Sequence, residues 1–210
     1  PQTWSISYGS PEQPDVNQYT ENMKRAATKI ALASSAGITT FVSSGDAGSS
    51  SVRTQFIFGP SFPADCPAVV SVGATANRWD YSNNKLRHEP SNSIFGDLIT
   101  SGGGISTVFP LPSFQKDLYE TKIAPLVKNM SVQGPIKPGR LNADVSAMGA
   151  NILTFIQGHK ISVAGTSASS PLVASLMTMW NNRLLQAGLP TMQNANAWVN
   201  NNPDAFTDIA

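Results

Sequence analysis

Residues 161–182 constrain the fold of this chain more than any other segment. They carry no charged side chain and are numerous enough to cross a membrane as a helix. Gly165 and Pro171 lie inside the segment, together with several serines and threonines, and such residues interrupt a continuous apolar helix. We therefore predict a buried strand that turns at Gly165 into a buried helix over residues 167–186, and no membrane span.

Two apolar strands flank an amphipathic helix at the start of the chain. Residues 3–8 are predicted to form the first strand, residues 18–36 the helix and residues 38–43 the second strand. Gly37 is a suitable stop for the helix. Because a strand, a helix and a second strand in this order usually make two parallel strands with a helical crossover, the chain is predicted to have an α/β fold.

The rest of the chain adds strands that are separated by turns and long polar segments. Residues 69–72 are predicted to form a further buried strand, and residues 152–156 and 160–163 a hairpin. Residues 77–97 are polar and are expected to be irregular. Residues 110–139 are rich in proline and polar side chains, so they are expected to form a long surface excursion.

The composition argues against nucleic acid as a partner and against a disulfide within the chain. The charged fraction, 13%, is well below the roughly 25% of typical soluble domains, and the formal net charge is +1. No run of lysine or arginine could follow a phosphate backbone, so nucleic acid is not expected as a partner. Cys66 is the only cysteine, and we expect a small buried apolar side chain there, with a bridge to a segment outside the chain as the alternative.

The chemistry is carried by the string Gly-Thr-Ser-Ala-Ser-Ser-Pro at positions 165–171. A strand enters this string and a helix leaves it, so Ser167 is predicted to lie at a helix N-terminus. Free N–H groups and the positive end of the helix dipole stabilise a developing oxyanion there, and small neighbours let a peptide backbone approach the hydroxyl. Pro171 is expected in the first helical turn, where its missing N–H costs little. A serine-rich helix cap is the alternative for this string alone.

The string resembles the nucleophile motif of sedolisins, the serine-carboxyl peptidases. Sedolisins carry Gly-Thr-Ser-Ala-Ser-x-Pro, whereas subtilisins normally have methionine where this chain has Ala168. Further blocks follow in the family's order: Trp-Ser-Ile-Ser-Tyr-Gly-Ser from position 4, Ser-Gly-Asp-Ala-Gly from 44, Phe-Pro-Ala-Asp-Cys-Pro from 62, Val-Gly-Ala-Thr from 72, Ser-Gly-Gly-Gly-Ile-Ser from 101, Ala-Asp-Val-Ser-Ala from 143 and Ala-Phe-Thr-Asp-Ile from 205. The resemblance implies a subtilisin-like α/β fold with a mostly parallel sheet and helices on both faces.

Position 46 separates sedolisins from subtilisins. Subtilisins place an asparagine there as a neutral donor to the oxyanion, and this chain has Asp46. An ionised carboxylate repels an oxyanion, whereas a protonated carboxyl donates a hydrogen bond to it. Aspartate normally titrates near ~3.9, so a donor of this kind needs acid pH, a raised pKa or both. The resemblance implies that Asp46 is the oxyanion-hole acid and that a glutamate replaces histidine as general base; on its own, Asp46 would be a turn residue.

Substrate-binding roles follow from the resemblance alone. It implies that Ser7, Tyr8 and Gly9 pair with the backbone of a peptide or protein substrate as an added strand. Thr166 is expected beside the scissile carbonyl. Peptide bonds would be cleaved through an acyl-enzyme on Ser167, by endopeptidase or tripeptidyl-peptidase action.

A calcium site and a secretory route are also implied by the resemblance. Asp208 would supply a carboxylate and Ile209 a backbone carbonyl to calcium, with helix capping by Asp208 as the alternative. An N-terminal propeptide is expected as a partner in the full-length protein. The expected location is secreted, lysosomal or vacuolar, and a glycosylation sequon at residues 129–131 gives this weak support.

Part of the family's machinery has no counterpart in this sequence. Sedolisins carry the general-base glutamate and its partner aspartate as Glu-x-x-x-Asp on a helix upstream of the substrate strand, but Glu12 and Asp15 here follow that strand. Residues 1–210 are therefore interpreted as the C-terminal two-thirds of a sedolisin catalytic domain, truncated at both ends. His88 and His159 lie in polar turns and are expected at the surface.

Two alternatives to an acid-acting sedolisin are kept. One is a subtilisin-like Ser-His-Asp peptidase whose histidine lies outside this sequence, which a neutral pH optimum would favour. The other is a non-catalytic pseudo-peptidase or an inert fragment. An upstream Glu-x-x-x-Asp helix would favour the sedolisin interpretation over both.

Asp144 is expected to be structural, bonding loop backbone near the nucleophile.

Overall fold

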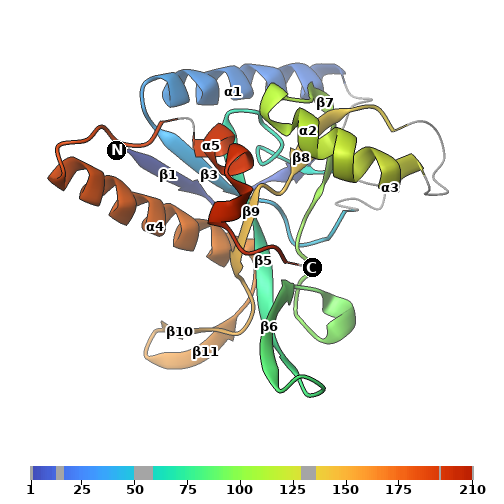
Figure 1. The fold of residues 1–210 in the computed structure, drawn as a ribbon, viewed down its shortest axis with the longest axis vertical. Helices are drawn as coiled ribbons and strands as arrows, with labels where there is room; N and C mark the ends of the chain where they lie inside the picture. The colour runs from blue at the N-terminus through green and yellow to red at the C-terminus, as the bar shows by residue number, and fades with distance from the viewer. Residues whose placement is uncertain (1, 13–16, 50–58, 129–135, 194, 210) are drawn as a thin grey trace.

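A five-stranded, mostly parallel sheet forms the centre of the molecule (Figure 1). The computed structural model describes residues 2–12, 17–49, 59–128, 136–193 and 195–209. The strands of the sheet are β1 (Thr3–Ile6), β3 (Thr39–Ser43), β5 (Val69–Asp80), β6 (Lys85–Pro90) and β9 (Val145–Met148). β3 lies between β1 and β5, and β9 pairs with β5; these pairings are parallel, whereas β6 is antiparallel to β5.

Helices cover both faces of this sheet, as the resemblance implied. α1 (Asn17–Ser35) connects β1 to β3 and packs on one face, which confirms the predicted crossover. α4 (Thr166–Gln186) and α5 (Ala195–Asn201) pack on the opposite face (Figure 1). Among the described residues, none of the helices combines the length and the apolar character that crossing a membrane requires.

The strand sequences explain why both faces are covered. Successive side chains of a strand point to opposite faces of the sheet. In β3, Val42 therefore packs towards α1 beside Met23, while its neighbour Phe41 packs towards α4 beside Ala174. Cover on both faces leaves all five residues of β3 buried, including the hydroxyl-bearing Thr39, Thr40 and Ser43.

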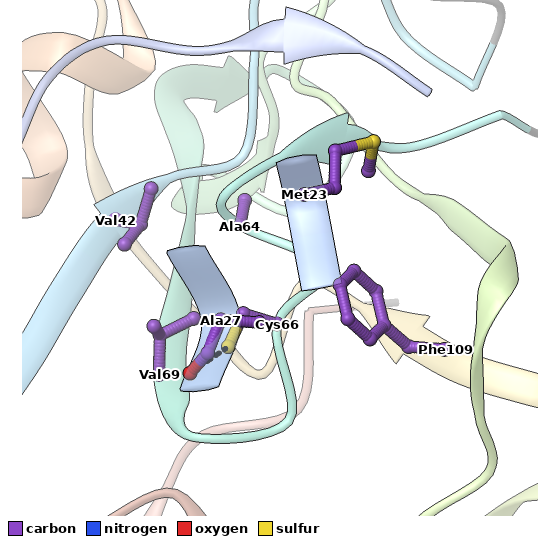
Figure 2. Packing of buried hydrophobic residues seen from close by; sticks show 7 residues of the cluster. All are labelled: Met23, Ala27, Val42, Ala64, Cys66, Val69 and Phe109. Atoms are coloured by element: carbon purple, nitrogen blue, oxygen red, sulfur yellow. Dashed lines mark hydrogen bonds between the residues drawn. The ribbon is translucent and has the colours of Figure 1, made fainter. Parts of the chain in front are cut away.

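Cys66 belongs to the core on the α1 side. Figure 2 shows its thiol directed at the carbonyl oxygen of Ala27, at 4.0 Å. Burial raises the pKa of this thiol to about 11, so the reactive thiolate is scarce at physiological pH. The prediction of a small buried apolar side chain is confirmed. The cluster consists of Met23, Ala27, Val42, Ala64, Cys66, Val69 and Phe109.

Shorter elements surround the sheet. β10 (Ile152–Ile156) and β11 (His159–Val163) form the predicted antiparallel hairpin. β2 (Ser10–Pro11) pairs with β4 (Ser61–Phe62), and β7 (Gly104–Pro110) pairs with β8 (Gly139–Asn142). Single helical turns are η1 (Ser93–Phe95) and η4 (Pro203–Ala205).

The prediction that residues 77–97 are irregular was wrong. β5 continues to Asp80 and turns back as β6, so this segment forms a hairpin. An ion pair between Arg87 and Asp80, with N and O 2.6 Å apart, links the two strands. Both strands are largely exposed here, so they lack the apolar alternation by which a half-buried strand is recognised.

The expectation of a long surface excursion over residues 110–139 was also wrong in part. The described part of this segment is mostly helical, and Tyr119 packs against Ile105 and Leu141 in a small core of its own. These contacts join residues far apart in the sequence, which no local pattern reveals. The sequon at 129–131 lies outside the described residues. The helical pieces are η2 (Ser113–Gln115), α2 (Lys116–Leu118), η3 (Tyr119–Ile123) and α3 (Ala124–Lys128).

Two acidic side chains are buried together beneath the loop that follows β1. Asp65 is 0% exposed and Glu12 is 5% exposed. Thr107 donates to Glu12 Oε2 from its backbone N–H and from its hydroxyl, both at 2.8 Å. When ionised, the Asp65 oxygens have no donor among the described residues, so the two carboxyls can bond only through a shared proton. Burial, and then the neighbouring Glu12, raise the pKa of Asp65 well above its usual range, while Arg140 opposes them.

This carboxyl pair makes stability depend on pH. Above the unfolded value near 3.8, the unfolded chain releases the Asp65 proton while the folded chain keeps it. The free energy of unfolding is therefore expected to fall as pH rises, by about 1.4 kcal/mol per pH unit until the folded carboxyl also titrates. Denaturant unfolding of the intact protein at about pH 4 and pH 7 measures this slope.

Asp65→Asn should flatten that slope, because an amide does not titrate. Its NH2 group can still donate a hydrogen bond to Glu12 in place of the shared proton. Asp204→Asn, at an exposed aspartate, is the matched control and should leave the slope unchanged. An unaltered slope in Asp65→Asn would show that the buried pair does not govern the pH dependence of stability.

Candidate active site

Ser167 is the second residue of α4, directly after the turn that leaves β11. The predicted strand-to-helix junction is therefore confirmed, with Ser167 exposed there and Gly165 and Thr166 buried. The expectation that the strand and the helix are both buried was wrong, because β11 belongs to an exposed hairpin outside the central sheet and α4 buries only one side. The first N–H groups of a helix have no partner within the helix, so they are available to an anion at this point.

Asp46 follows β3 and meets the start of α4. Its Oδ1 accepts hydrogen bonds from the backbone N–H and from the hydroxyl of Thr166, both at 2.8 Å. The Thr166 hydroxyl oxygen in turn accepts from the backbone N–H of Gly45, at 3.2 Å. Thr166, which was expected beside the scissile carbonyl, is thus brought against Asp46 with its side chain only 1% exposed.

Gly165 leaves a small space between Asp46 and Ser167. A Cβ at this position would lie 3.3 Å from Asp46 Oδ2, 3.6 Å from the backbone N of Ser167 and 3.8 Å from Ser167 Cβ. The φ angle of Gly165 is +147°, which also disfavours any other residue. One atom placed in this space can approach a backbone N–H, a carboxyl oxygen and the serine side chain together, as the oxyanion of acyl transfer must.

The loop that carries Asp46 is held by the glycine turn at 101–104. A Cβ on Gly102 would lie 2.3 Å from the carbonyl oxygen of Ser44, so only glycine fits there. This close approach lets the Gly102 N–H donate to the carbonyl of Gly45 at 2.7 Å, and the Thr100 N–H donates to the carbonyl of Asp46 at 3.0 Å.

Ser7 contacts the nucleophile residue directly. Its hydroxyl donates to the backbone carbonyl of Ser167 at 2.8 Å. Pro171 explains why this carbonyl is free: it was expected in the first helical turn, but α4 begins at Thr166, so Pro171 lies in the second turn and has no N–H to donate to Ser167. The helical bond that proline removes is replaced by a bond from the segment after β1.

The other two residues of the expected substrate strand lie beyond β1, which ends at Ile6 and not at Tyr8. Tyr8 is 81% exposed. A Cβ on Gly9 would lie 2.8 Å from the carbonyl oxygen of Phe62, so Gly9 packs its backbone closely against the loop before β5. Ser7 and Tyr8 are exposed beside Ser167, where an extended peptide has access.

The helix start is also tied to neighbouring strands by serines that sequence patterns did not distinguish. Ser169 is fully buried and its hydroxyl donates to the carbonyls of Ala147 and Met148, at 3.1 and 3.2 Å. The hydroxyls of Ser5 and Ser170 lie 3.1 Å apart. These bonds fix the position of the nucleophile relative to β9 and β1.

Asp144 has the structural role that was expected, with a partner that was not. Its carboxylate accepts from the backbone N–H of Ser71 at 2.7 Å and pairs with the guanidinium of Arg140. Both side chains of this ion pair are 0% exposed. A buried arginine is expected to be paired, but nothing local in the sequence indicates that Arg140 is buried.

The two residues that were expected to bind calcium are both accessible to solvent. Asp208 is exposed and Ile209 is half-buried in the segment after η4. Their carboxylate and carbonyl oxygens are of the type that calcium prefers, but calcium takes about six to eight oxygen ligands. Within the described ranges, no group of three or more histidine, cysteine, aspartate or glutamate side chains could hold a metal ion. His88 and His159, as expected, are exposed, on β6 and β11.

Comparison with known proteins agrees with this geometry. The profile described as the Subtilase family matches residues 1–197. Tripeptidyl-peptidase SED2 of Arthroderma otae is 31% identical over 100% of this chain, and tripeptidyl-peptidase 1 of Canis lupus familiaris is 32% identical over 91% of it. The chain spans only 33% and 32% of the lengths of these two relatives.

A solved structure shows the same fold. A Pseudomonas sedolisin, described as a serine-carboxyl proteinase in complex with pseudo-iodotyrostatin, superposes with a TM-score of 0.71 and 23% identity. The match covers 99% of this chain and 55% of that one. The chain thus belongs to the subtilase family, in the sedolisin branch that the order of its motifs predicted.

Proposed function

We propose that this chain is the nucleophile-bearing part of an acid-acting serine peptidase. Ser167 is the nucleophile and Asp46 the acid that donates a hydrogen bond to the oxyanion. The observation that carries this proposal is the space at Gly165, which is bordered by Asp46 Oδ2, the Ser167 N–H and the Ser167 side chain. The tripeptidyl-peptidase relatives support peptides as the substrate class.

The reaction begins when the Ser167 hydroxyl oxygen attacks the carbonyl carbon of the scissile peptide bond. A general base removes the hydroxyl proton, and the carbonyl oxygen becomes an oxyanion that accepts from the Ser167 N–H and from the Asp46 carboxyl. Collapse of this intermediate breaks the C–N bond, and the amine leaves with the proton that the base returns. Water then attacks the acyl-enzyme by the same route and releases the acid product.

We propose that the general base is a glutamate outside residues 1–210, in agreement with the sedolisin resemblance. A glutamate titrates near ~4.3, so it can act as an effective base at acid pH. Substrate would extend along Ser7, Tyr8 and Gly9. The names of the relatives support removal of tripeptides from the free N-terminus of a substrate. Cleavage at internal peptide bonds is the alternative activity.

Three further properties are proposed. Calcium would be held by Asp208 and Ile209 together with ligands outside this chain, and would rigidify the C-terminal segment. A propeptide would precede the catalytic domain. The protein would follow a secretory or lysosomal and vacuolar route, where an acid-acting peptidase finds a suitable pH.

The test of the proposed function is hydrolysis of a peptide library by the intact protein between about pH 3 and 7, the range that spans carboxyl titration. Mass spectrometry of the products identifies tripeptides or internal fragments. We expect an acid optimum. A neutral optimum would favour a Ser-His-Asp peptidase, and no hydrolysis at any pH would favour a pseudo-peptidase.

The chain of residues 1–210 by itself is expected to be inactive and to unfold without a cooperative transition. β1 pairs only with β3 among the described strands, and α4 exposes a row of apolar side chains. Large exposed apolar faces and unpaired sheet edges normally require a covering segment. The row consists of Leu172, Leu176, Met179 and Trp180.

Circular dichroism during thermal unfolding and a peptide assay on the purified chain measure this, with the intact protein as control. Cooperative unfolding together with peptidase activity of the isolated chain would contradict the expectation. Such a result would place the general base within residues 1–210.

A further inference from the structure

Thr166 holds the Asp46 carboxyl in one orientation. Its backbone N–H and its hydroxyl both donate to the same oxygen, Oδ1, at 2.8 Å. The hydroxyl has its direction set, because its oxygen accepts from the Gly45 N–H at 3.2 Å and its hydrogen is then free for Asp46. Thr166 is 1% exposed, so its own hydroxyl is shielded from water, whereas Asp46 is exposed.

The two oxygens of Asp46 are therefore unlike. Oδ1 receives two donors and acts as an acceptor only. A protonated carboxyl has one O–H group. If its proton were on Oδ1, it would face the two hydrogens that Thr166 already donates to that oxygen, and the like-charged hydrogens would repel one another. Oδ2 is the oxygen that borders the space at Gly165, 3.3 Å from the Cβ position there. The proton of a neutral Asp46 thus belongs on Oδ2, where an oxyanion can accept it.

We propose that Thr166 is a positioning residue which fixes Asp46 so that Oδ2 alone carries the transferable hydrogen bond to the oxyanion. This inference rests on the proposed function, in which Asp46 is the oxyanion-hole acid. This role differs from the expected contact of Thr166 with the scissile carbonyl, because the Thr166 hydroxyl already bonds to Asp46 and to Gly45.

The described segments that contact the Asp46 loop bring no ionisable side chain to it. The segments packed against the Asp46 loop present Thr100, Gly102, Gly165 and Thr166, none of which ionises. Within the described ranges, none of the ion pairs involves Asp46, and Asp97, three residues before Thr100, is paired with Arg78. A change in the donors to Oδ1 should therefore appear directly in the pH dependence of turnover.

A purely structural role of the same contact is the rival explanation. Asp46 also caps α4, because it accepts the N–H of the first helical residue. Loss of a cap lowers stability and reduces turnover at every pH alike. Loss of a donor to the charged form of a carboxyl also favours its neutral form, so the two roles predict different pH profiles.

The experiment measures kcat and KM against pH for the intact protein with one peptide substrate. Thr166→Val removes the hydroxyl at nearly constant volume. It should lower kcat by roughly tenfold or more, with KM changed less, because the neutral Asp46 carboxyl loses one of the two donors that orient it. The alkaline limb of its kcat profile should move to higher pH. Thr166→Ser keeps the hydroxyl and should restore both the rate and the limb.

The same substitution in an Asp46→Asn background provides the control. An amide cannot titrate, so Thr166→Val should leave the alkaline limb of that protein where it is. If Thr166→Val does not fold, as judged by circular dichroism, Thr166→Ala removes the hydroxyl with a smaller side chain and is compared in the same way.

Two outcomes overturn the proposal and are distinct from failure of the proposed function. One is a Thr166→Val protein with unchanged kcat and limb, while Asp46→Ala is strongly impaired. The other is a limb shift that persists in the Asp46→Asn background. If Asp46→Ala itself retains full turnover, the proposed function fails, and with it the role of Thr166.

Discussion

Replacing Ser167 by alanine in the intact protein is expected to lower kcat by about 10⁴- to 10⁶-fold. The hydroxyl oxygen is the atom that forms the acyl-enzyme, and alanine has no group that can replace it. Binding and folding should change little, because Ser167 is exposed and its carbonyl, which Ser7 holds, is retained. Turnover of a fluorogenic peptide at the pH optimum measures the loss.

Ser175→Ala is the matched control for this variant. Ser175 is an exposed serine on the same helix, and its hydroxyl donates only to the carbonyl of Pro171. Its removal should leave turnover near that of the unmodified protein. A Ser167→Ala protein that folds normally and keeps comparable turnover would mean that another residue is the nucleophile.

Asp46→Ala is expected to reduce kcat by about 10²- to 10³-fold, the usual effect of losing one oxyanion donor. KM should change less, because the interaction forms only when the oxyanion develops. Asp46→Asn keeps a donor at every pH. It should therefore lose less activity than Asp46→Ala, and the alkaline limb of its profile should move upward until another group limits it.

Turnover of these variants between about pH 3 and 7 tests this prediction, since the range spans the titration of carboxyl groups. Asp117→Asn, at an exposed aspartate of α2, is the matched control and should behave like the unmodified protein. Equal activity of the unmodified protein and Asp46→Ala throughout the range would leave Asp46 as a helix-capping turn residue. The stability of Asp46→Ala should be measured in parallel, because its bond to the first residue of α4 also contributes to folding.

Local patterns were sufficient to predict the parts of the fold that carry the nucleophile and the acid. The apolar run of β3, the amphipathic period of α1 and the break at Gly165 each lie within one segment, and the structure confirms the elements they predict. Asp46 follows β3 of the central sheet and Ser167 follows β11 of a separate hairpin, and the bonds from Thr166 to Asp46 bring the two segments together. The motif string therefore indicated the candidate site, whereas the contact between the Asp46 segment and the Ser167 segment came only from the folded structure.

The features that were missed depend on contacts between distant segments. β6 is a polar strand whose pairing with β5 leaves no apolar alternation, and η3 is held by Tyr119, which packs against Ile105 of β7 and Leu141 of β8. The helix α5, which was not predicted, is short and rich in asparagine, and its Asn200 donates to the buried Asp144 at 2.9 Å. A pattern of hydrophobicity cannot reveal buried polar networks of this kind.

The role of Thr166 shows the same limit within the site itself. The sequence places it beside Ser167, which suggested contact with substrate, but the structure joins it to a residue 120 positions away. The direction of a single side chain at a strand-to-helix turn depends on the neighbouring segments, so the positioning role that we propose for Thr166 rests on its two bonds to Asp46.

The central claim, that Ser167 is acylated during peptide hydrolysis, is tested most directly by trapping the intermediate. The intact protein is mixed with an activated peptide ester at acid pH, quenched in strong acid within the first turnover, digested and analysed by mass spectrometry. The account predicts a peptide acyl group on the fragment that contains Ser167, with a matching burst of the alcohol product, and neither in Ser167→Ala. An acyl group on another residue, or full turnover with no acylated Ser167 at any time, would contradict it.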